Sequence, residues 1–295
     1  MLSHHIELNG QSFHYLGWGT AGAPVMLFLH GFPEYSGAWA DFAPRFADHY
    51  HCIAPDQRGY GQSWAPEEVS EYQVTKLVGD MTALLDHLGA DQAVVVGHDW
   101  GAAVAYAMGF MAPQRVSRLI ILNGVHPAPF QTSMAAGGAQ TDASQYIHTL
   151  KREGSEDWLA GDDFDRLLQI FSAKMDQSWL TDEKLDAYKH EWARPGRLRG
   201  MVNWYRASPL QLGQPGERLD NVPQIPADRL HIPMPHLLVW GTGDTALLPE
   251  ATEGLEEYCA DLTRKDVAGA DHWIIHQKPD QAAQIIQDWL GAQPA

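Results

Sequence analysis

The stretch Ala93-Val94-Val95-Val96-Gly97-His98-Asp99-Trp100-Gly101-Ala102-Ala103-Val104-Ala105 decides how the rest of the chain is interpreted. Its apolar, β-branched first part predicts a buried strand, and its alanine-rich second part predicts a helix. Between the two parts, Gly97 and Gly101 flank Asp99. Glycine is needed where two backbone segments pass too closely for a Cβ atom. The pattern therefore predicts a sharp strand-to-helix turn that presents Asp99 as a nucleophile.

An aspartate at the centre of this turn implies a particular chemistry. A carboxylate is already ionised at neutral pH, whereas a serine hydroxyl needs a neighbouring base before it can attack. We therefore expect Asp99 to attack a carbon atom and to form an ester with the enzyme. A serine esterase is excluded because residue 99 is not serine. A glycine-bounded turn with no catalytic role is the structural alternative.

An ester on Asp99 must be broken again, which requires a base for water and an acid that orients this base. Along the chain after such a turn, the acid comes first and the histidine second, each at the end of a later strand. Asp244 comes directly after the expected strand 235–240. His272 comes after the expected strand that ends near residue 267. Asn123 follows another expected strand but cannot carry a negative charge, so Asp244 is the expected acid.

Breaking the ester also creates an oxyanion, which two backbone N–H groups should stabilise. One donor should be the N–H of Trp100, directly after the nucleophile. The other should be the N–H of Phe32, in the loop His30-Gly31-Phe32-Pro33 that follows the expected strand 25–29. Pro33 restricts this loop and is compatible with a cis peptide bond.

Alternating strand and helix patterns on both sides of a helical stretch predict the fold. Strands alternate with helices over residues 13–122 and again over 235–290, which is typical of a doubly wound, mostly parallel α/β sheet. The intervening part shows only helical patterns, over residues 143–151, 164–174, 182–192 and 197–205. We expect a core of residues 1–124 and 226–295 and a helical cap of residues 125–225 inserted after the sixth strand. The cap should cover the carboxyl edge of the sheet, where such sheets bind ligands.

Composition narrows the classes of partner. The chain has 295 residues, 45% of them hydrophobic, and 20 basic against 37 acidic residues give a net charge of −17. This charge argues against nucleic acid and anionic membranes as partners. No apolar run approaches the ~20 residues that span a bilayer, and the first residues do not form a signal peptide. The two cysteines have no metal-ligand spacing. We expect a cytoplasmic protein.

Four motifs together resemble one family. They are His30-Gly31-Phe32-Pro33-Glu34, Asp56-x-Arg58-Gly59-Tyr60-Gly61, Gly97-His98-Asp99-Trp100-Gly101 and Gly269-Ala270-Asp271-His272-Trp273. With them the chain resembles the epoxide hydrolases of the α/β-hydrolase fold, densely in the expected core and sparsely in the expected cap. The resemblance implies that Asp99 opens an epoxide and that His272, supported by Asp244, activates water to release a vicinal diol. It also implies that no metal or organic cofactor is needed.

The resemblance further implies that two tyrosines of the cap bind and protonate the epoxide oxygen. Val202-Asn203-Trp204-Tyr205-Arg206 matches the motif of one of them and points to Tyr205. Ser144-Gln145-Tyr146-Ile147-His148 stands where the other is expected and points to Tyr146, with Tyr188 as the alternative. The expected substrate is a small apolar epoxide, and a homodimer is an expected assembly. The side chains expected to line the substrate pocket are Phe32, Pro33, Trp100 and Trp273.

Two other functions compete with this interpretation. A hydrolytic dehalogenase would use the same aspartate, but haloalkane dehalogenases commonly have a halide-binding Asn where Phe32 stands. Fluoroacetate dehalogenases have arginines after the nucleophile, where this chain has Trp100 and Ala103-Val104. Both departures favour the epoxide hydrolase, and the dehalogenase is kept as the alternative. A non-catalytic ligand-binding protein is a more distant alternative, because it would not need Asp99, His272 and Asp244 together.

Overall fold

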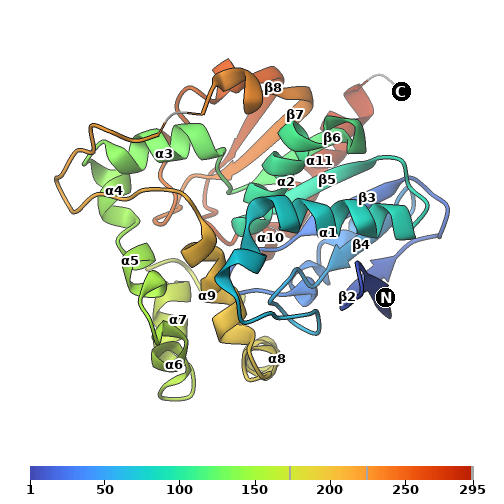
Figure 1. The fold of residues 1–295 in the computed structure, drawn as a ribbon. Helices are drawn as coiled ribbons and strands as arrows, with labels where there is room; N and C mark the ends of the chain where they lie inside the picture. The colour runs from blue at the N-terminus through green and yellow to red at the C-terminus, as the bar shows by residue number, and fades with distance from the viewer. Residues whose placement is uncertain (173, 224, 294–295) are drawn as a thin grey trace.

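The computed structural model describes residues 1–172, 174–223 and 225–293 and contains one sheet of eight strands (Figure 1). The strands lie in the order β1-β2-β4-β3-β5-β6-β7-β8, and β2 runs antiparallel to both of its neighbours. The strands from β4 through β3 to β8 are mutually parallel. Their bounds are β1 (Leu2–Leu8), β2 (Gln11–Trp18), β3 (Val25–Leu29), β4 (His51–Pro55), β5 (Ala93–His98), β6 (Val116–Leu122), β7 (Ile232–Gly241) and β8 (Cys259–Val267). The mostly parallel α/β sheet expected from the sequence is thereby confirmed.

Helices cover both faces of the sheet. In Figure 1, α1 and α2 lie in front of it and α11 lies behind it. The helices are α1 (Val74–His87), α2 (Trp100–Met111), α3 (Pro127–Ala135), α4 (Ala139–Ala143), α5 (Tyr146–Lys151), α6 (Ser155–Ala160), α7 (Asp165–Ser172), α8 (Asp182–Trp192), α9 (Arg197–Ala207), α10 (Ile274–Gln277) and α11 (Pro279–Ala292).

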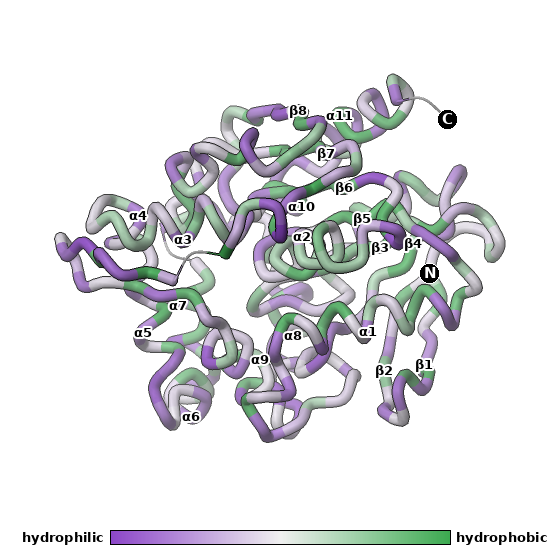
Figure 2. The backbone as a smooth tube through the Cα atoms, turned by 45° about the horizontal axis from the view of Figure 1, so that its top comes forward, coloured by the Kyte–Doolittle hydropathy of each residue, from purple (hydrophilic) through white to green (hydrophobic). Residues whose placement is uncertain are grey.

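Side-chain alternation along the central strands produces two hydrophobic cores. In β3, Leu27 and Leu29 pack with α1, α2 and the later helices, whereas Met26 and Phe28 pack with α11 on the opposite face. This two-sided burial explains why the central strands are continuous apolar runs. Figure 2 shows the hydrophobic colour concentrated around β5 and α2.

Most expected elements are present, with shifts at their ends. The expected helix 143–151 is divided, because α4 ends at Ala143 and α5 begins at Tyr146. The expected helix 164–174 is α7, and residue 173 of that range lies outside the described residues. Sequence patterns missed β1 because it is an edge strand with mostly exposed or half-exposed side chains and therefore no apolar run.

The helices α3 to α9, here called the helical segment, follow the sixth strand and precede β7. In Figure 1 they lie to one side of the sheet. Their tryptophans bind loops at the carboxyl ends of β3 and β4: Trp192 Nε1 donates to the Pro33 carbonyl (2.6 Å), and Trp204 Nε1 donates to the Arg58 carbonyl (2.9 Å). The segment therefore lies against the carboxyl edge of the sheet.

Within the described ranges, every helix is too short or too polar to cross a membrane.

Candidate active site

The turn between β5 and α2 holds Asp99 in an unusual backbone conformation. Asp99 has φ 51° and ψ −121°, and α2 begins at the next residue. A Cβ atom on Gly97 would lie 2.7 Å from the Cα of Ala102, and one on Gly101 would collide with the carbonyl of Leu29. These contacts explain the need for both glycines. A positive φ is uncommon outside glycine and often marks a functional position.

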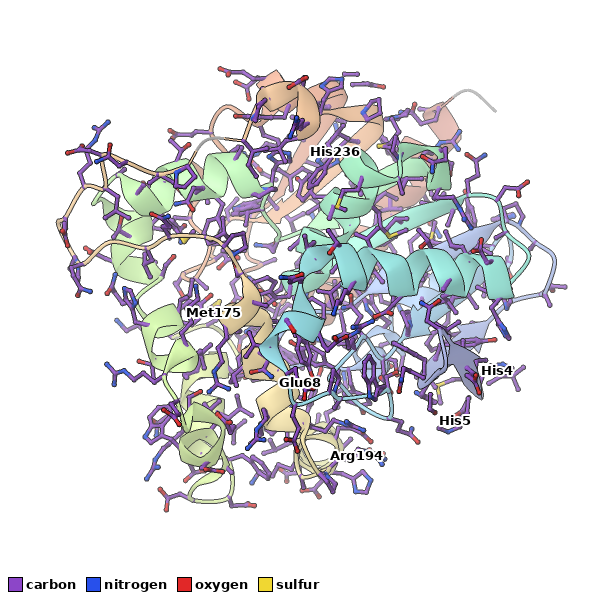
Figure 3. All side chains as sticks on the ribbon, in the orientation of Figure 1. His4, His5, Glu68, Met175, Arg194 and His236 are labelled. Atoms are coloured by element: carbon purple, nitrogen blue, oxygen red, sulfur yellow. The ribbon has the colours of Figure 1, made fainter. Side chains whose placement is uncertain are left out.

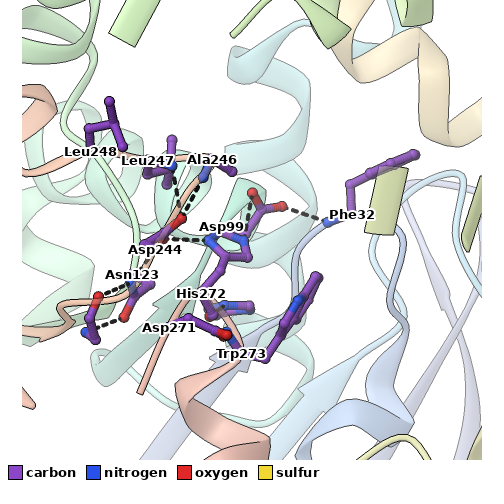
Figure 4. Close-up of polar contacts among 12 residues, drawn as sticks. Phe32, Asp99, Asn123, Asp244, Ala246, Leu247, Leu248, Asp271, His272 and Trp273 are labelled. Atoms are coloured by element: carbon purple, nitrogen blue, oxygen red, sulfur yellow. Dashed lines mark hydrogen bonds and ion pairs between the residues drawn. The ribbon is translucent and has the colours of Figure 1, made fainter. Parts of the chain in front are cut away.

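The Asp99 carboxylate has a different neighbour at each oxygen (Figure 4). Oδ1 accepts the backbone N–H of Phe32 at 2.7 Å, and Oδ2 lies 3.5 Å from His272 Nε2. The loop can approach this closely because a Cβ atom on Gly31 would collide with the carboxylate. The Phe32–Pro33 peptide bond is cis. Trp100 is the first residue of α2, so its N–H has no acceptor inside the helix.

His272 and Asp244 complete a chain of contacts that leads away from Asp99. His272 Nδ1 lies 2.8 Å from Asp244 Oδ2, and both residues are buried. Asp244 follows β7 and His272 follows β8, so the sheet brings together side chains that are 28 residues apart. Two histidines near the N-terminus are remote from this site: His4 and His5 lie on β1 at the outer edge of the sheet (Figure 3).

The charges at this site act on His272 from two sides. Burial by itself would lower the pKa of His272, but Asp244 and Asp99 outweigh this effect and raise the pKa well above 6.5. Burial likewise works to raise the pKa of Asp244, but His272 and the donors around it hold that pKa below its ordinary value. While Asp99 is ionised, His272 is therefore biased toward the imidazolium form.

The sequence indicates only that Asn123 cannot be the acid of the site. In the structure, Asn123 contacts both Asp244 and Asp99. Its Nδ2 donates to Asp244 Oδ2 at 2.9 Å, and its backbone carbonyl accepts the N–H of Asp99 at 3.3 Å. The available signal was its place at the end of β6, between two strands that carry site residues.

Glu34 is a second residue whose position sequence reasoning missed. Its carboxylate is fully buried and contacts His98 Nδ1 (3.1 Å), His276 Nε2 (2.7 Å) and the Tyr188 hydroxyl (3.0 Å). Burial works to raise the pKa of Glu34, but the hydrogen bonds from His276 and His98 hold it far below its ordinary value. His98 Nε2 also lies 2.7 Å from the backbone carbonyl of His272. Glu34 thus connects the loop after β3, the Asp99 turn and α8.

Two tyrosines of the helical segment, the buried Tyr205 and the partly buried Tyr146, lie near the Asp99 turn. Tyr205 on α9 packs edge-to-face against Phe32 (ring centroids 5.3 Å apart) and Trp100 (5.0 Å). Tyr146 on α5 packs edge-to-face against Tyr205 at 6.2 Å. Burial raises the pKa of both hydroxyls, and the charge of Asp99 adds to this effect. Both hydroxyls therefore stay protonated at neutral pH.

Tyr188 is committed to another partner. Its hydroxyl donates to Glu34 Oε1, and its ring packs against Tyr35 at 5.4 Å. The structure thus places Tyr146, rather than Tyr188, beside Tyr205.

The four expected pocket residues have different surroundings. Phe32 and Trp100 contact Tyr205, as described above. The Pro33 carbonyl accepts the Trp192 indole N–H, and the Trp273 ring packs against His272 (4.9 Å) and Phe171 (4.2 Å). Within the described part of the chain, no group of three or more His, Cys, Asp or Glu side chains is arranged to hold a metal ion.

The chain is similar in sequence to known hydrolases. Residues 24–279 match the α/β hydrolase fold family. The chain is 33% identical to Epoxide hydrolase 1 of Caenorhabditis elegans, over 98% of this chain and 70% of that one. It is 30% identical to Epoxide hydrolase 4 of Homo sapiens, over 97% of this chain and 77% of that one.

Solved structures are similar as well. An epoxide hydrolase from metagenomes of hot environments has a TM-score of 0.90 and 34% identity, over 99% of each chain. The Bacillus megaterium epoxide hydrolase, solved with an inhibitor, has a TM-score of 0.88 and 28% identity, over 98% of this chain and 100% of that one. The family match covers most of the sequence and includes the turn at Asp99 and the loop that follows β3. The chain is therefore a hydrolase that belongs to the α/β hydrolase fold family.

Proposed function

We propose that this protein hydrolyses epoxides to vicinal diols through a covalent ester on Asp99. The observation that carries the proposal is one carboxylate with Phe32 N–H at one oxygen and the His272–Asp244 pair at the other. The similarity to proteins named epoxide hydrolases supports epoxides as the substrate class.

In the first step, an oxygen of Asp99 attacks an epoxide carbon and the ring C–O bond breaks. Tyr205 and Tyr146 donate hydrogen bonds to the ring oxygen. One of the two hydroxyls transfers its proton to this oxygen as it becomes a hydroxyl group, and a tyrosinate is left behind. The raised pKa of both tyrosines supports this role, because each hydroxyl remains a donor at neutral pH. The product of this step is a hydroxyalkyl ester of Asp99.

In the second step, His272 takes a proton from water, and the resulting hydroxide attacks the ester carbonyl. Ester formation removes the negative charge of Asp99, which is one of the two charges that raise the pKa of His272. The pKa of His272 should therefore fall when the ester forms, so that the imidazole becomes a base when a base is needed. The N–H groups of Phe32 and Trp100 stabilise the oxyanion. When the oxyanion collapses, the imidazolium of His272 gives its proton to the departing alkoxide, which completes the diol. The carboxyl proton left on Asp99 returns to the tyrosinate, and the ionised Asp99 is restored.

The helical segment fits the role of a cap in this reaction. We propose that residues 125–225 form a cap domain over a core of residues 1–124 and 226–295. The hydrogen bonds from Trp192 and Trp204 to the loops after β3 and β4 support this division, because they hold the tyrosine-bearing helices over the Asp99 turn. Residues 173, 224 and 294–295 of these ranges lie outside the described residues.

Trapping the ester tests the mechanism directly. His272→Gln should form the ester but not hydrolyse it, so mixing with styrene oxide should increase the protein mass by the mass of one epoxide. Peptide mapping should place the adduct on Asp99. Asp99→Ala should show neither an adduct nor turnover. A His272→Gln protein that remains unmodified during slow diol formation would contradict the covalent mechanism.

The dehalogenase alternative is tested with the same preparations. Wild-type protein should release halide from 1-chlorobutane or fluoroacetate much more slowly than it forms the diol from styrene oxide. The apolar Phe32 side chain beside Asp99 is the reason for this expectation, because it offers no hydrogen bond to a leaving halide. Faster release of halide than of diol would favour the dehalogenase.

A further inference from the structure

Asn123 lies between the Asp99 turn and Asp244, and hydrogen bonds to neighbouring strands fix its backbone. It is fully buried and has φ 38°, a left-handed conformation that Asn tolerates better than most residues. Its backbone N–H donates to the Val239 carbonyl in β7 at 3.1 Å, and its carbonyl accepts the N–H of Asp99. The side chain is thereby directed from the end of β6 toward the end of β7.

The side-chain amide of Asn123 can be oriented in only one way. The backbone N–H of Gly241 can only donate, and it lies 2.7 Å from Oδ1. Nδ2 therefore faces two acceptors, the Gly241 carbonyl at 3.2 Å and Asp244 Oδ2 at 2.9 Å. An aspartate at residue 123 could not donate in this way unless it carried a proton.

The Asp244 oxygen that Asn123 binds is the one that faces His272. Oδ2 contacts both His272 Nδ1 and Asn123 Nδ2, whereas Oδ1 accepts the backbone N–H groups of Ala246 and Leu247 at 2.9 Å each. A donor to a carboxylate stabilises its charge and lowers its affinity for another proton. The amide thus competes with the imidazolium for the same oxygen.

We propose that Asn123 is a positioning residue that holds the Asp244 carboxylate and limits how strongly this carboxylate binds the proton on His272. The proposal rests on the proposed ester mechanism, in which His272 must become neutral before it can activate water. Asn123 then affects the hydrolysis of the ester and leaves the attack of Asp99 on the epoxide unchanged.

Two variants separate this role from simple packing. Asn123→Ala removes the donor, and Asn123→Asp keeps the shape and the acceptor for Gly241 but places a second carboxylate beside Asp244. Both changes should hold the proton on His272 more strongly, so ester hydrolysis should require a higher pH. The titratable groups that contact His272 are Asp99, Asp244 and His98. Asp271 precedes it in the chain, Glu34 lies behind His98, and Tyr146 interacts electrostatically with Asp99 and Asp244; both variants retain all of these groups.

The experiment follows the two steps separately with styrene oxide at pH values from 5.5 to 9. Quenched-flow mass spectrometry gives the rate of ester formation and the rate of ester loss at each pH. The midpoint for ester loss should rise by about half a unit to one unit in Asn123→Ala and by about one unit or more in Asn123→Asp. Below the midpoint, each unit corresponds to a loss of about tenfold in the rate at fixed pH. Ester formation should stay within about threefold of wild type in both variants, since neither touches the reacting oxygens.

The control is Asn203→Ala, which changes another buried asparagine. Asn203 Nδ2 donates to the Glu67 carbonyl, and its Oδ1 accepts from Arg206, so it contacts neither Asp244 nor His272. Its midpoint for ester loss should match that of wild type. Thermal unfolding of every variant checks that it is folded.

The outcomes distinguish the two proposals. Unchanged midpoints in both folded Asn123 variants would overturn the assignment of Asn123, and so would an equal loss of rate in both steps at every pH. If wild-type protein and His272→Gln form no ester, the proposed function fails instead.

Discussion

Asp99 depends on residues that leave room for its carboxylate as much as on residues that bind it. The Phe32 N–H reaches Oδ1 because Gly31 places no side chain between the loop and the nucleophile. At Gly97 and Gly101, on the two sides of the turn, there is likewise no space for a Cβ atom. At the scale of single residues, therefore, the site is sensitive to added methyl groups.

Gly31→Ala should strongly slow ester formation. The new Cβ atom would overlap the Asp99 carboxylate, so either the loop or the nucleophile must move. We expect the rate of ester formation with styrene oxide to fall by at least about 100-fold, because a displacement of about 1 Å at a reacting atom has effects of this size. Gly79→Ala, on α1, is the control for an alanine at a glycine position with open space. Near-wild-type ester formation in Gly31→Ala would show that the loop adjusts freely.

The tyrosines provide a second test at residue scale. Tyr205→Phe and Tyr146→Phe each remove one donor to the epoxide oxygen, so each should slow ester formation by about 10²–10⁴-fold. Tyr188→Phe is the matched control, because the Tyr188 hydroxyl binds Glu34 instead. Its rate of ester formation should stay within about tenfold of wild type. Single-turnover measurements with styrene oxide check all three variants, and equal losses in all three would remove the distinction between Tyr146 and Tyr188.

At the scale of elements, two buried histidines connect the sheet with the segments beside it. His126 Nε2 donates to the Leu230 carbonyl (2.9 Å), and its Nδ1 accepts the Ala128 N–H (3.3 Å), so it joins the start of α3 to the chain just before β7. His236 on β7, labelled in Figure 3, contacts the Tyr106 hydroxyl of α2 at 3.0 Å. Each histidine has one ring nitrogen facing a donor, which favours the neutral form.

These histidines should make the fold sensitive to acid. Burial lowers the pKa of His126 to about 4 and that of His236 to about 3. An unfolded histidine titrates near 6.5, so below that pH the unfolded state binds protons that the folded state refuses. Their contribution to stability is complete above about pH 6.5 and decreases by about 1.4 kcal/mol per pH unit for each histidine as the pH falls. Urea unfolding between pH 7 and 4.5 measures the free energy of unfolding.

A variant identifies the contribution of one histidine. His126→Gln should be less stable than wild type at pH 7 but should lose less stability per pH unit between pH 6 and 5, by about 1.4 kcal/mol. His5→Gln, which changes an exposed histidine on β1, is the control and should retain the wild-type slope. An unchanged slope in His126→Gln would show that His126 protonates freely in the folded state.

At the scale of the whole molecule, buried hydrogen bonds join the helical segment to the loops beside the sheet. If the two parts separated, the groups on both sides would lose these partners. Trp192, Trp204 and Tyr188 each donate to the core, at Pro33, Arg58 and Glu34 respectively. The buried aromatic side chains of the segment, among them Phe171 and Trp192, also belong to the same hydrophobic core as β3, β5 and α2. We therefore expect the two parts to unfold together.

Trp204→Phe tests this coupling. It leaves the buried Arg58 carbonyl without its indole donor, which should cost about 1–3 kcal/mol of stability. The melting temperature should fall by several degrees while a single transition remains. Far-UV circular dichroism and tryptophan fluorescence should give coincident curves, and Trp158→Phe, at a side chain that is 41% exposed, should melt as wild type does. Two separate transitions would contradict the coupling.

The order of elements could be predicted from the sequence because it depends on local properties. Apolar runs, glycines beside Asp99 and the placement of Asp244 and His272 after expected strands all lie within short stretches. Parallel strands end at the same edge of a sheet, so these strand-end residues were expected to meet, and the structure brings them into contact. The fold expected on this basis is confirmed, and the catalytic roles stay predictions.

Contacts between distant segments could be decided only by the tertiary structure. Tyr146 and Tyr188 both lie in helical patterns, and only the packing of α5 and α8 places one beside Tyr205 and the other on Glu34. From the sequence, Asn123 is only a strand-end residue without a carboxylate, whereas in the structure its amide binds the acid Asp244. Helical periodicity indicates which residues share a face but not which partner that face meets. The sequence by itself therefore determined the nucleophile turn and the order of the strands, and the packing of the helices decided which side chains surround them.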